Sequence, residues 1–152
     1  MCCSCAGPRA SLQKIIVPVE QLPRGMGMPM IKPSGIPHMR FVNYNPQIFT
    51  GRESLEEMAH SLMTPHFDRE TLTGALLSTY TTPEELVVYG MVYTTPEVCE
   101  AARKTLKPFL QPRDGVVIQT RENRMAIIWS EAGKKPKEAT FTEMVNFVDR
   151  HL

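Results

Sequence analysis

Hydrophobic residues follow strand-like patterns in two stretches of the chain after residue 37. The first, His38–Phe49, is rich in aromatic and β-branched residues, which favour strands, and Pro46 within it favours the edge of a sheet. The second, Leu86–Tyr93, is apolar throughout, which is typical of a central strand buried on both faces. Gly90 within it predicts a bulge or a close approach of other parts of the chain.

Helical spacing follows the first of these strands. Ser54 and Glu57 form a capping box, in which each side chain satisfies a backbone amide of the other residue, and Pro65 ends the helix that it starts. Asp68 then predicts a second helix by capping its first turn. The apolar faces expected are Leu55, Met58, Ala59 and Leu62 in the first helix, and Leu72, Ala75, Leu76 and Tyr80 in the second.

Two further helices are predicted nearer the C-terminus. The run Thr95-Pro96-Glu97 offers a capping hydroxyl, a proline at the first helical position and an acid in the first turn, and Pro108 marks the end of the helix. A second capping box, Thr140 with Glu143, starts the last helix. The residues expected to face the core are Val98, Ala102 and Leu106 in the former, and Phe141, Met144, Val145, Val148 and Leu152 in the latter.

Residues 116–121 and 124–129 predict two strands joined through Glu122-Asn123, a short hairpin connection. The order of all these elements predicts an α+β fold, in which a mostly antiparallel sheet carries helices on one face. Residues 86–152, in the order β-α-β-β-α, are compatible with ferredoxin-like packing. That likeness concerns architecture alone and implies no function.

The N-terminal third differs from the rest in composition and charge. Seven of the 13 prolines precede residue 47, and residues 1–52 carry six basic residues against one acid, whereas the remainder carries 11 basic and 15 acidic residues. Proline removes a backbone donor and fixes φ, so this density predicts an extended, partly polyproline-like arm over residues 1–37. Plain disorder is the alternative. A single α+β domain is then expected over residues 38–152.

Apolar and aromatic side chains in and beside this arm predict contacts with a partner. The candidate residues are Ile15, Ile16, Val17, Met28, Met30, Arg40, Phe41 and Tyr44. The expected partners are other protein subunits, because so much apolar surface favours a binding groove. Arg40, Phe41 and Tyr44 also place a base and two rings on one predicted strand, a pattern that suits stacking on RNA in an anionic, RNA-containing assembly.

Three cysteines crowd the N-terminus, at Cys2, Cys3 and Cys5. The favoured interpretation is that they are reduced and incidental. One alternative is S-acylation, which would anchor the chain to a membrane. The other is a soft-metal site for Cu(I), to which the thioethers of Met26, Met28 and Met30 would add ligands. The same methionines could instead offer adaptable apolar contact to a partner.

Free thiols and the lack of an apolar secretory run favour a reducing intracellular compartment, either the cytoplasm or the mitochondrion. The sequence predicts no cofactor, since it contains no phosphate loop, dinucleotide fingerprint or nucleophile elbow. The weak catalytic candidates are Glu57, His60, His66 and Asp68. Glu57 and His60 have the spacing used in dinuclear iron sites, but such sites need a second copy of the motif, and a solvated charged face is favoured.

These observations together predict a non-catalytic interaction or assembly subunit of a larger complex, whose N-terminal arm threads over partner chains. Two alternatives belong to other classes. One is a copper-binding protein that uses the N-terminal Cys and Met ligands, and the other is a small enzyme with a pocket near the segment from residue 57 to residue 68.

Overall fold

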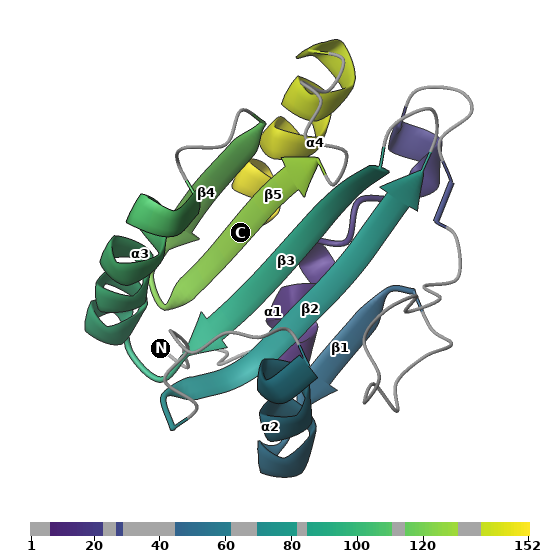
Figure 1. Cartoon of the computed structure of the whole chain (residues 1–152). Coiled ribbons are helices and arrows are strands. Elements are labelled where there is room, and N and C mark those ends of the chain that lie inside the picture. Colours follow the sequence, from purple (N-terminus) through teal and green to yellow (C-terminus); the bar gives the residue numbers. More distant parts are fainter. Residues whose placement is uncertain are drawn as a thin grey trace, which may run out of the picture.

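A computed structural model describes residues 7–22, 27–28, 45–61, 70–81, 85–110, 115–130 and 138–152. Within these residues the chain forms an α+β fold with a five-stranded antiparallel sheet in the order β1-β2-β3-β5-β4 (Figure 1). The strands are β1 (Gln47–Thr50), β2 (Leu72–Thr81), β3 (Glu85–Tyr93), β4 (Val116–Arg121) and β5 (Arg124–Ser130). The helices are α1 (Pro8–Lys14), α2 (Arg52–Ser61), α3 (Pro96–Leu110) and α4 (Glu138–His151), with a 3-10 turn at Val19–Gln21.

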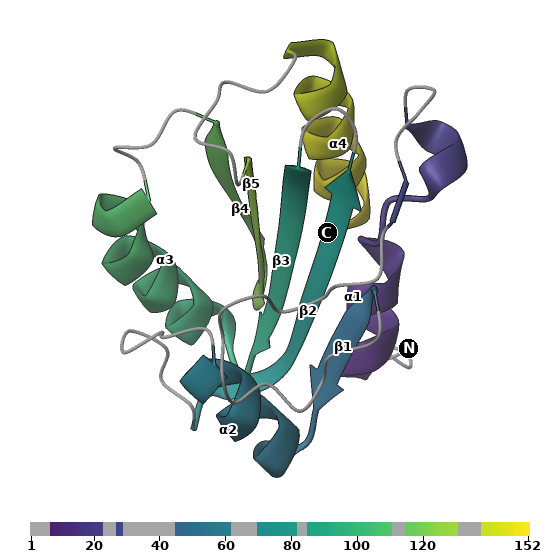
Figure 2. The same ribbon diagram turned by 45° about the vertical axis from the view of Figure 1, so that its right-hand side comes forward.

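Helices cover both faces of the sheet, α1 and α4 on one and α2 and α3 on the other (Figure 2). Along β3, Leu86 and Val88 face the α1 and α4 side, while Val87 and Tyr89 face the α2 and α3 side. The prediction of helices on one face is therefore wrong, because the central strands are apolar on both sides and each side needs a cover. Ferredoxin-like packing of residues 86–152 is not confirmed, since α3 and α4 lie on opposite faces.

The helix predicted after Asp68 is wrong over its described part, because residues 72–81 form strand β2. Leu72, Ala75, Leu76 and Tyr80 have helical spacing, yet Ala75 and Leu76 are buried on opposite faces of the sheet. The strand pairs with β1 on one side and β3 on the other. A strand buried on both faces has few polar positions, so its pattern cannot be told from that of a buried helix by periodicity alone.

The remaining elements agree with the prediction except at their ends. The central strand β3 and the hairpin of β4 and β5 are confirmed. Helix α3 begins as predicted, with Thr95 Oγ1 accepting from the Val98 amide at 3.3 Å, but it runs through Pro108 to Leu110. Helices α2 and α4 each begin two residues before their predicted caps. Of the strand predicted over His38–Phe49, the described part is β1, which lies at a sheet edge as expected.

The N-terminal segment packs onto the sheet, which the predicted arm did not anticipate. Helix α1 lies across the backbone of β2 and β3 where two glycines leave room for it. A Cβ added at Gly74 would lie 2.8 Å from Pro8 Cβ, and one at Gly90 would lie 2.6 Å from Ile15 Cδ1. The close approach predicted at Gly90 is thus found, without a register shift there. Residues 7–22 belong to the same folded unit as the sheet, so the predicted boundary after residue 37 does not separate them.

Candidate protein-interaction edge

Four of the predicted partner-binding residues fall among the described residues. Ile15 and Val17 are each 1% exposed and fill the core beneath α1 and α4, and the Val17 amide donates to the Tyr80 hydroxyl at 2.9 Å. Ile16 and Met28 are half-buried against the same core. A role for Ile15 and Val17 in binding a partner is therefore corrected, because their own chain already covers them. Outside the described residues lie Met30, Arg40, Phe41, Tyr44 and the thiols of Cys2, Cys3 and Cys5.

The two edges of the sheet differ in length, and β1 is the shorter one. It has four residues, and the Asn45 side chain extends its pairing with β2, donating to the Thr79 carbonyl at 2.7 Å and accepting from the Thr79 amide at 3.1 Å. Gln47 and Phe49 make further interactions besides their pairing with β2. Helices α1 and α2 both contact this strand (Figure 1). A short edge strand of this kind resists pairing with another chain.

The opposite edge is β4, whose six residues pair only with β5 within the described part of the chain. The tight hairpin fixes which backbone groups point outward. Arg121 and Arg124 flank the turn and form a hydrogen-bonded pair, and such pairs alternate along an antiparallel ladder. The N–H and C=O groups of Val116, Ile118 and Thr120 therefore point away from β5.

A contact between the hairpin and the end of β3 supports this assignment of the outward backbone groups. The Tyr93 amide donates to the Asn123 carbonyl at 2.8 Å, and the Asn123 side-chain amide donates to the Tyr93 carbonyl at 2.7 Å. Odd-numbered residues of β5 thus bond to β3, which leaves its even-numbered residues to bond to β4. Asn123 also fixes the hairpin to the end of β3, where Glu122 takes a φ of 54°.

The side chains of β4 suit an added strand. Val116, Val117 and Ile118 are half-buried, Thr120 and Arg121 are exposed, and Arg121 is the one charged residue of the strand. Natural edge strands usually carry a proline, a bulge or an inward charge that blocks pairing. The sequence of β4 has no proline, its register with β5 shows no shift, and its charge stands at the end of the strand.

Helices hold β4 in place on both faces (Figure 2). Val116 and Ile118 pack against the core beneath α3, while the Gln119 side-chain amide donates to the Val145 carbonyl of α4 at 3.3 Å. The other amide atom, Gln119 Oε1, is buried and has no hydrogen-bond partner among the described residues. An open strand supported in this way keeps its outward backbone groups in the geometry that an incoming strand needs.

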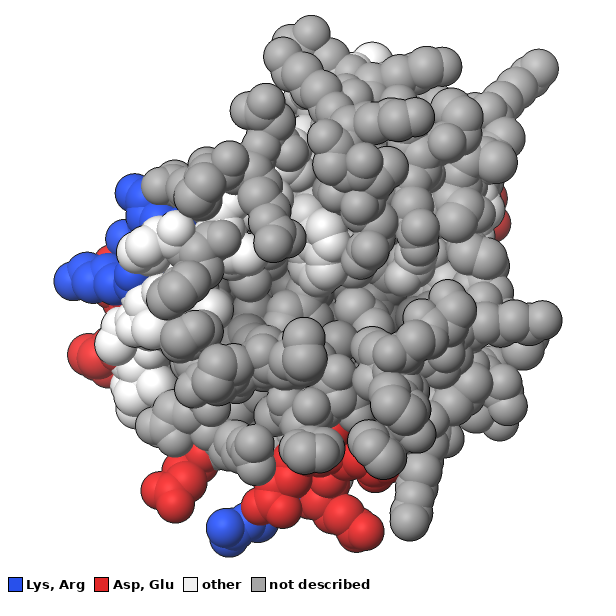
Figure 3. Space-filling view, in the orientation of Figure 1, with Lys and Arg blue, Asp and Glu red and all other residues white. Residues whose placement is uncertain are grey.

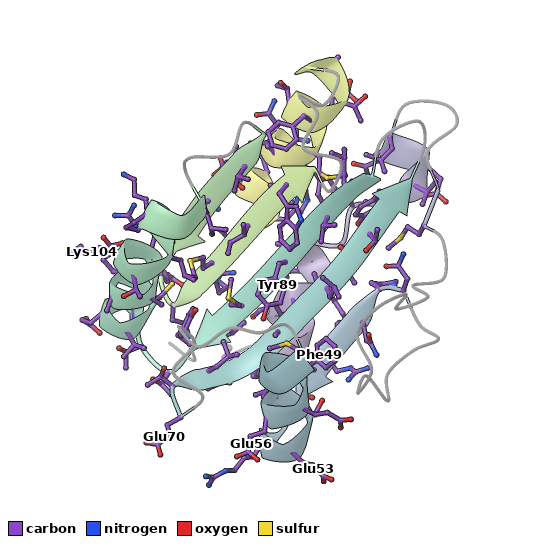
Figure 4. All side chains as sticks on the ribbon, viewed as in Figure 1. Phe49, Glu53, Glu56, Glu70, Tyr89 and Lys104 are labelled. Carbon is purple, nitrogen blue, oxygen red and sulfur yellow. The ribbon has the colours of Figure 1, made fainter. Side chains whose placement is uncertain are left out.

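Clefts are also present on the described surface, and two of them have defined linings. A cleft of about 470 Å³ lies beside the start of α2 and is lined by Gly51, Arg52, Leu55, Glu56, Glu70, Leu72 and Thr73. Carboxylates gather at this end of the molecule (Figures 3 and 4). The exposed Arg52 and Glu56 side chains form an ion pair at 2.9 Å, which raises the pKa of Arg52. A smaller cleft of about 250 Å³ lies between the 3-10 turn and α4.

Neither of these clefts is lined, within the described residues, by the side chains predicted for catalysis or metal binding. Within the described residues no group of three or more His, Cys, Asp or Glu side chains is placed to hold a metal ion. Glu57 is half-buried on α2, whereas the side chain of His60, together with His66 and Asp68, lies outside the described residues. The enzyme and copper alternatives therefore remain predictions.

The buried hydroxyl and thiol groups near α2 and α3 belong to the packed core on that face of the sheet. Tyr89 lies on the α2 side of the sheet (Figure 4). The Tyr89 hydroxyl donates to Met58 Sδ and the Tyr93 hydroxyl to Met91 Sδ, each at 3.4 Å, and burial raises the pKa of both tyrosines. Burial also raises the pKa of Cys99 to about 11, so this thiol stays protonated at neutral pH and is a poor nucleophile.

Comparisons of the chain give no indication of family. No protein-family model, curated protein or solved structure matches it. No helix among the described residues combines the length and the apolar character needed to cross a membrane. The geometry of the β4 edge is therefore the basis for a functional proposal, and this edge was not among the sites predicted from the sequence.

Proposed function

We propose that the protein is a non-catalytic interaction subunit of a larger assembly, and that it docks an extended segment of a partner protein chain onto the outer edge of β4. The observation that carries this proposal is the row of outward backbone groups at Val116, Ile118 and Thr120, which pair with no other described strand. An added strand gains affinity from main-chain hydrogen bonds and specificity from alternate side chains.

The contrast with β1 supports the same proposal. Both strands lie at an edge of one sheet, but β1 has only four residues, whereas β4 has six. An exposed, regular and apolar edge strand is an aggregation hazard unless a partner covers it. The open β4 edge is thus best explained by a partner that occupies it in the native assembly.

Parts of the sequence-based hypothesis stay within the proposal. The predicted partner-binding residues Met30, Arg40, Phe41 and Tyr44 are proposed to make a second contact with partner chains. A reducing intracellular compartment fits the free thiols of the chain.

The test removes one outward hydrogen-bond donor and leaves the inner ladder intact. Thr120 is exposed and its N–H points away from β5, so Thr120→Pro deletes a donor that only a docked strand would use. Thr120→Val is the matched control, since it keeps the N–H and the β-branched shape. Each version is expressed in cells of the native source, and the native mass of the complex is measured in a gentle lysate.

We expect a wild-type species well above the 17.2 kDa of one chain. Thr120→Pro should lower that mass, because the loss of a backbone bond and the bulk of the ring together weaken docking by about tenfold or more. Thr120→Val should leave it unchanged. A wild-type species that runs as a lone monomer, or a complex that is indifferent to Thr120→Pro, would contradict the proposal.

A further inference from the structure

We infer that the chain that occupies the β4 edge is a second copy of this protein, which pairs antiparallel through its own β4 so that two five-stranded sheets join into one. The inference rests on the proposed function, because it names the partner at the same edge. Three features of β4 support it, namely the symmetry of the outward groups, the side chains that they bring together and the position of the charge.

The outward groups of β4 are symmetric about Ile118. A two-fold axis at Ile118 places this residue opposite its own copy and places Val116 opposite Thr120 of the second copy. All three of these positions have outward N–H and C=O groups, so every opposed pair exchanges two hydrogen bonds. The ladder would then contain about six bonds between the two chains.

The side chains brought together are compatible across the axis. On the face that packs beneath α3, Ile118 meets Ile118, and Val116 meets Thr120, which are pairs of β-branched residues. Such pairs each stabilise a sheet by roughly 0.2 to 1 kcal/mol. On the other face Val117 lies opposite Gln119, so the ladder juxtaposes no two charged groups.

The position of Arg121 favours the antiparallel arrangement over a parallel one. The axis at Ile118 places Arg121 opposite Gly115 of the second copy, so the two guanidinium groups stand about six residues, or about 20 Å, apart. That separation exceeds the Debye length of about 8 Å at physiological salt, so their repulsion is screened. Parallel pairing in register would instead place the two Arg121 side chains next to each other.

The β4 edge offers a longer ladder than the β1 edge, since β4 has six residues and β1 has four. A short edge strand pairs less readily with another chain, so pairing through β4 is the favoured arrangement. The ladder is six residues long, and it lies between α3 and α4 (Figure 2). A contact of this size is smaller than a standard stable interface, so we expect a dissociation constant in the micromolar range.

The experiment measures the mass of the purified full-length chain by light scattering, at concentrations from about 1 to about 300 µM. We expect wild type and Thr120→Val to approach twice 17.2 kDa as the concentration rises, and Thr120→Pro to remain at 17.2 kDa. A wild type that is monomeric throughout overturns the second-copy inference. The lysate experiment with the same variants then decides separately whether another protein occupies the edge.

A charge pair at position 118 tests the symmetry itself. Ile118→Lys and Ile118→Glu each place two like charges opposite each other, so each variant alone should be monomeric. Mixed in equal amounts they should form a heterodimer, because Lys then faces Glu. A mixture that stays monomeric while wild type dimerises, or a wild-type dimer that persists in Thr120→Pro, overturns the proposed pairing. Ile118 is half-buried, so the fluorescence of Trp129 and a thermal melt confirm that the variants are folded.

Discussion

The two edges of the sheet end in strands of different length. At β1, four residues pair with β2, the Asn45 side chain continues that pairing, and α1 and α2 contact the strand. At β4, six regular residues keep alternate backbone groups directed away from β5, and helices pack on both faces. The longer, regular strand offers more backbone groups to an incoming strand, which is why the proposed docking is placed at β4.

The largest expected effect comes from truncating Ile15, a buried side chain that follows α1 and packs over β3. Ile15→Ala should lower the free energy of unfolding by about 3 kcal/mol, because Ile15 is 1% exposed and its loss leaves a cavity over β3. Ile16→Ala is the matched control and should cost about 1 kcal/mol, since that side chain is only half-buried. Urea unfolding followed by Trp129 fluorescence measures both.

Two outcomes would instead support Ile15 as a partner contact. One is an equal loss of unfolding free energy in both variants, and the other is a loss of assembly in Ile15→Ala without a loss of stability. The comparison therefore separates a core residue from a docking residue at adjacent positions.

An intermediate effect is expected when the pairing of β1 with β2 is shortened. Asn45→Ala removes both hydrogen bonds to the backbone of Thr79, a residue that is 8% exposed, and should cost about 2 kcal/mol in urea unfolding. The dimer formed through β4 should be unaffected, since Asn45 lies at the opposite edge. Asn45→Asp keeps the acceptor for the Thr79 amide but sets a carboxylate oxygen against the Thr79 carbonyl, so it should cost at least as much as Asn45→Ala. A dimer that weakens in Asn45→Ala would show that the two edges are not independent.

The smallest effect concerns the turn that carries β4. Glu122 has a φ of 54°, which disfavours any residue with a Cβ, so Glu122→Gly should stabilise the protein by about 0.5 kcal/mol after the entropy of glycine is subtracted. Asn123→Ala is the contrasting variant and should cost about 1 kcal/mol, because it removes the bond to the Tyr93 carbonyl. Thermal melts show whether each variant is more or less stable than wild type. A destabilising Glu122→Gly would mean that the Glu122 carboxylate stabilises the fold by more than the positive φ costs.

Local signals in the sequence were sufficient for several elements. The apolar run of β3, the hairpin at Glu122-Asn123 and the cap at Thr95 are each specified by neighbouring residues. Strand β2 was mistaken for a helix because both of its faces are buried, which is a property of its neighbours and not of its own pattern. Helix α1 was missed because it has seven residues in a Pro-rich, basic segment, and it is held in place by packing over Gly74 and Gly90.

The candidate site could not be predicted because the order of strands in a sheet is a tertiary property. The sequence predicts strands over residues 116–121 and 124–129, and nothing in the hairpin alone states which of them pairs with β3. A signal was nevertheless present, since β5 is almost wholly apolar after Arg124, whereas β4 ends in Gln119, Thr120 and Arg121. The more polar strand of a hairpin is the better candidate for the edge.

Amide hydrogen exchange along β4 tests the central claim most directly, because the strand contains its own control. In the dilute monomer the amides of Val117 and Gln119 should be protected by β5, while those of Ile118 and Thr120 should exchange rapidly. In the concentrated or assembled protein all four should be protected. Uniform protection in the monomer, or outward amides that stay unprotected in the assembly, would contradict the account of β4 as an open edge that docks another chain.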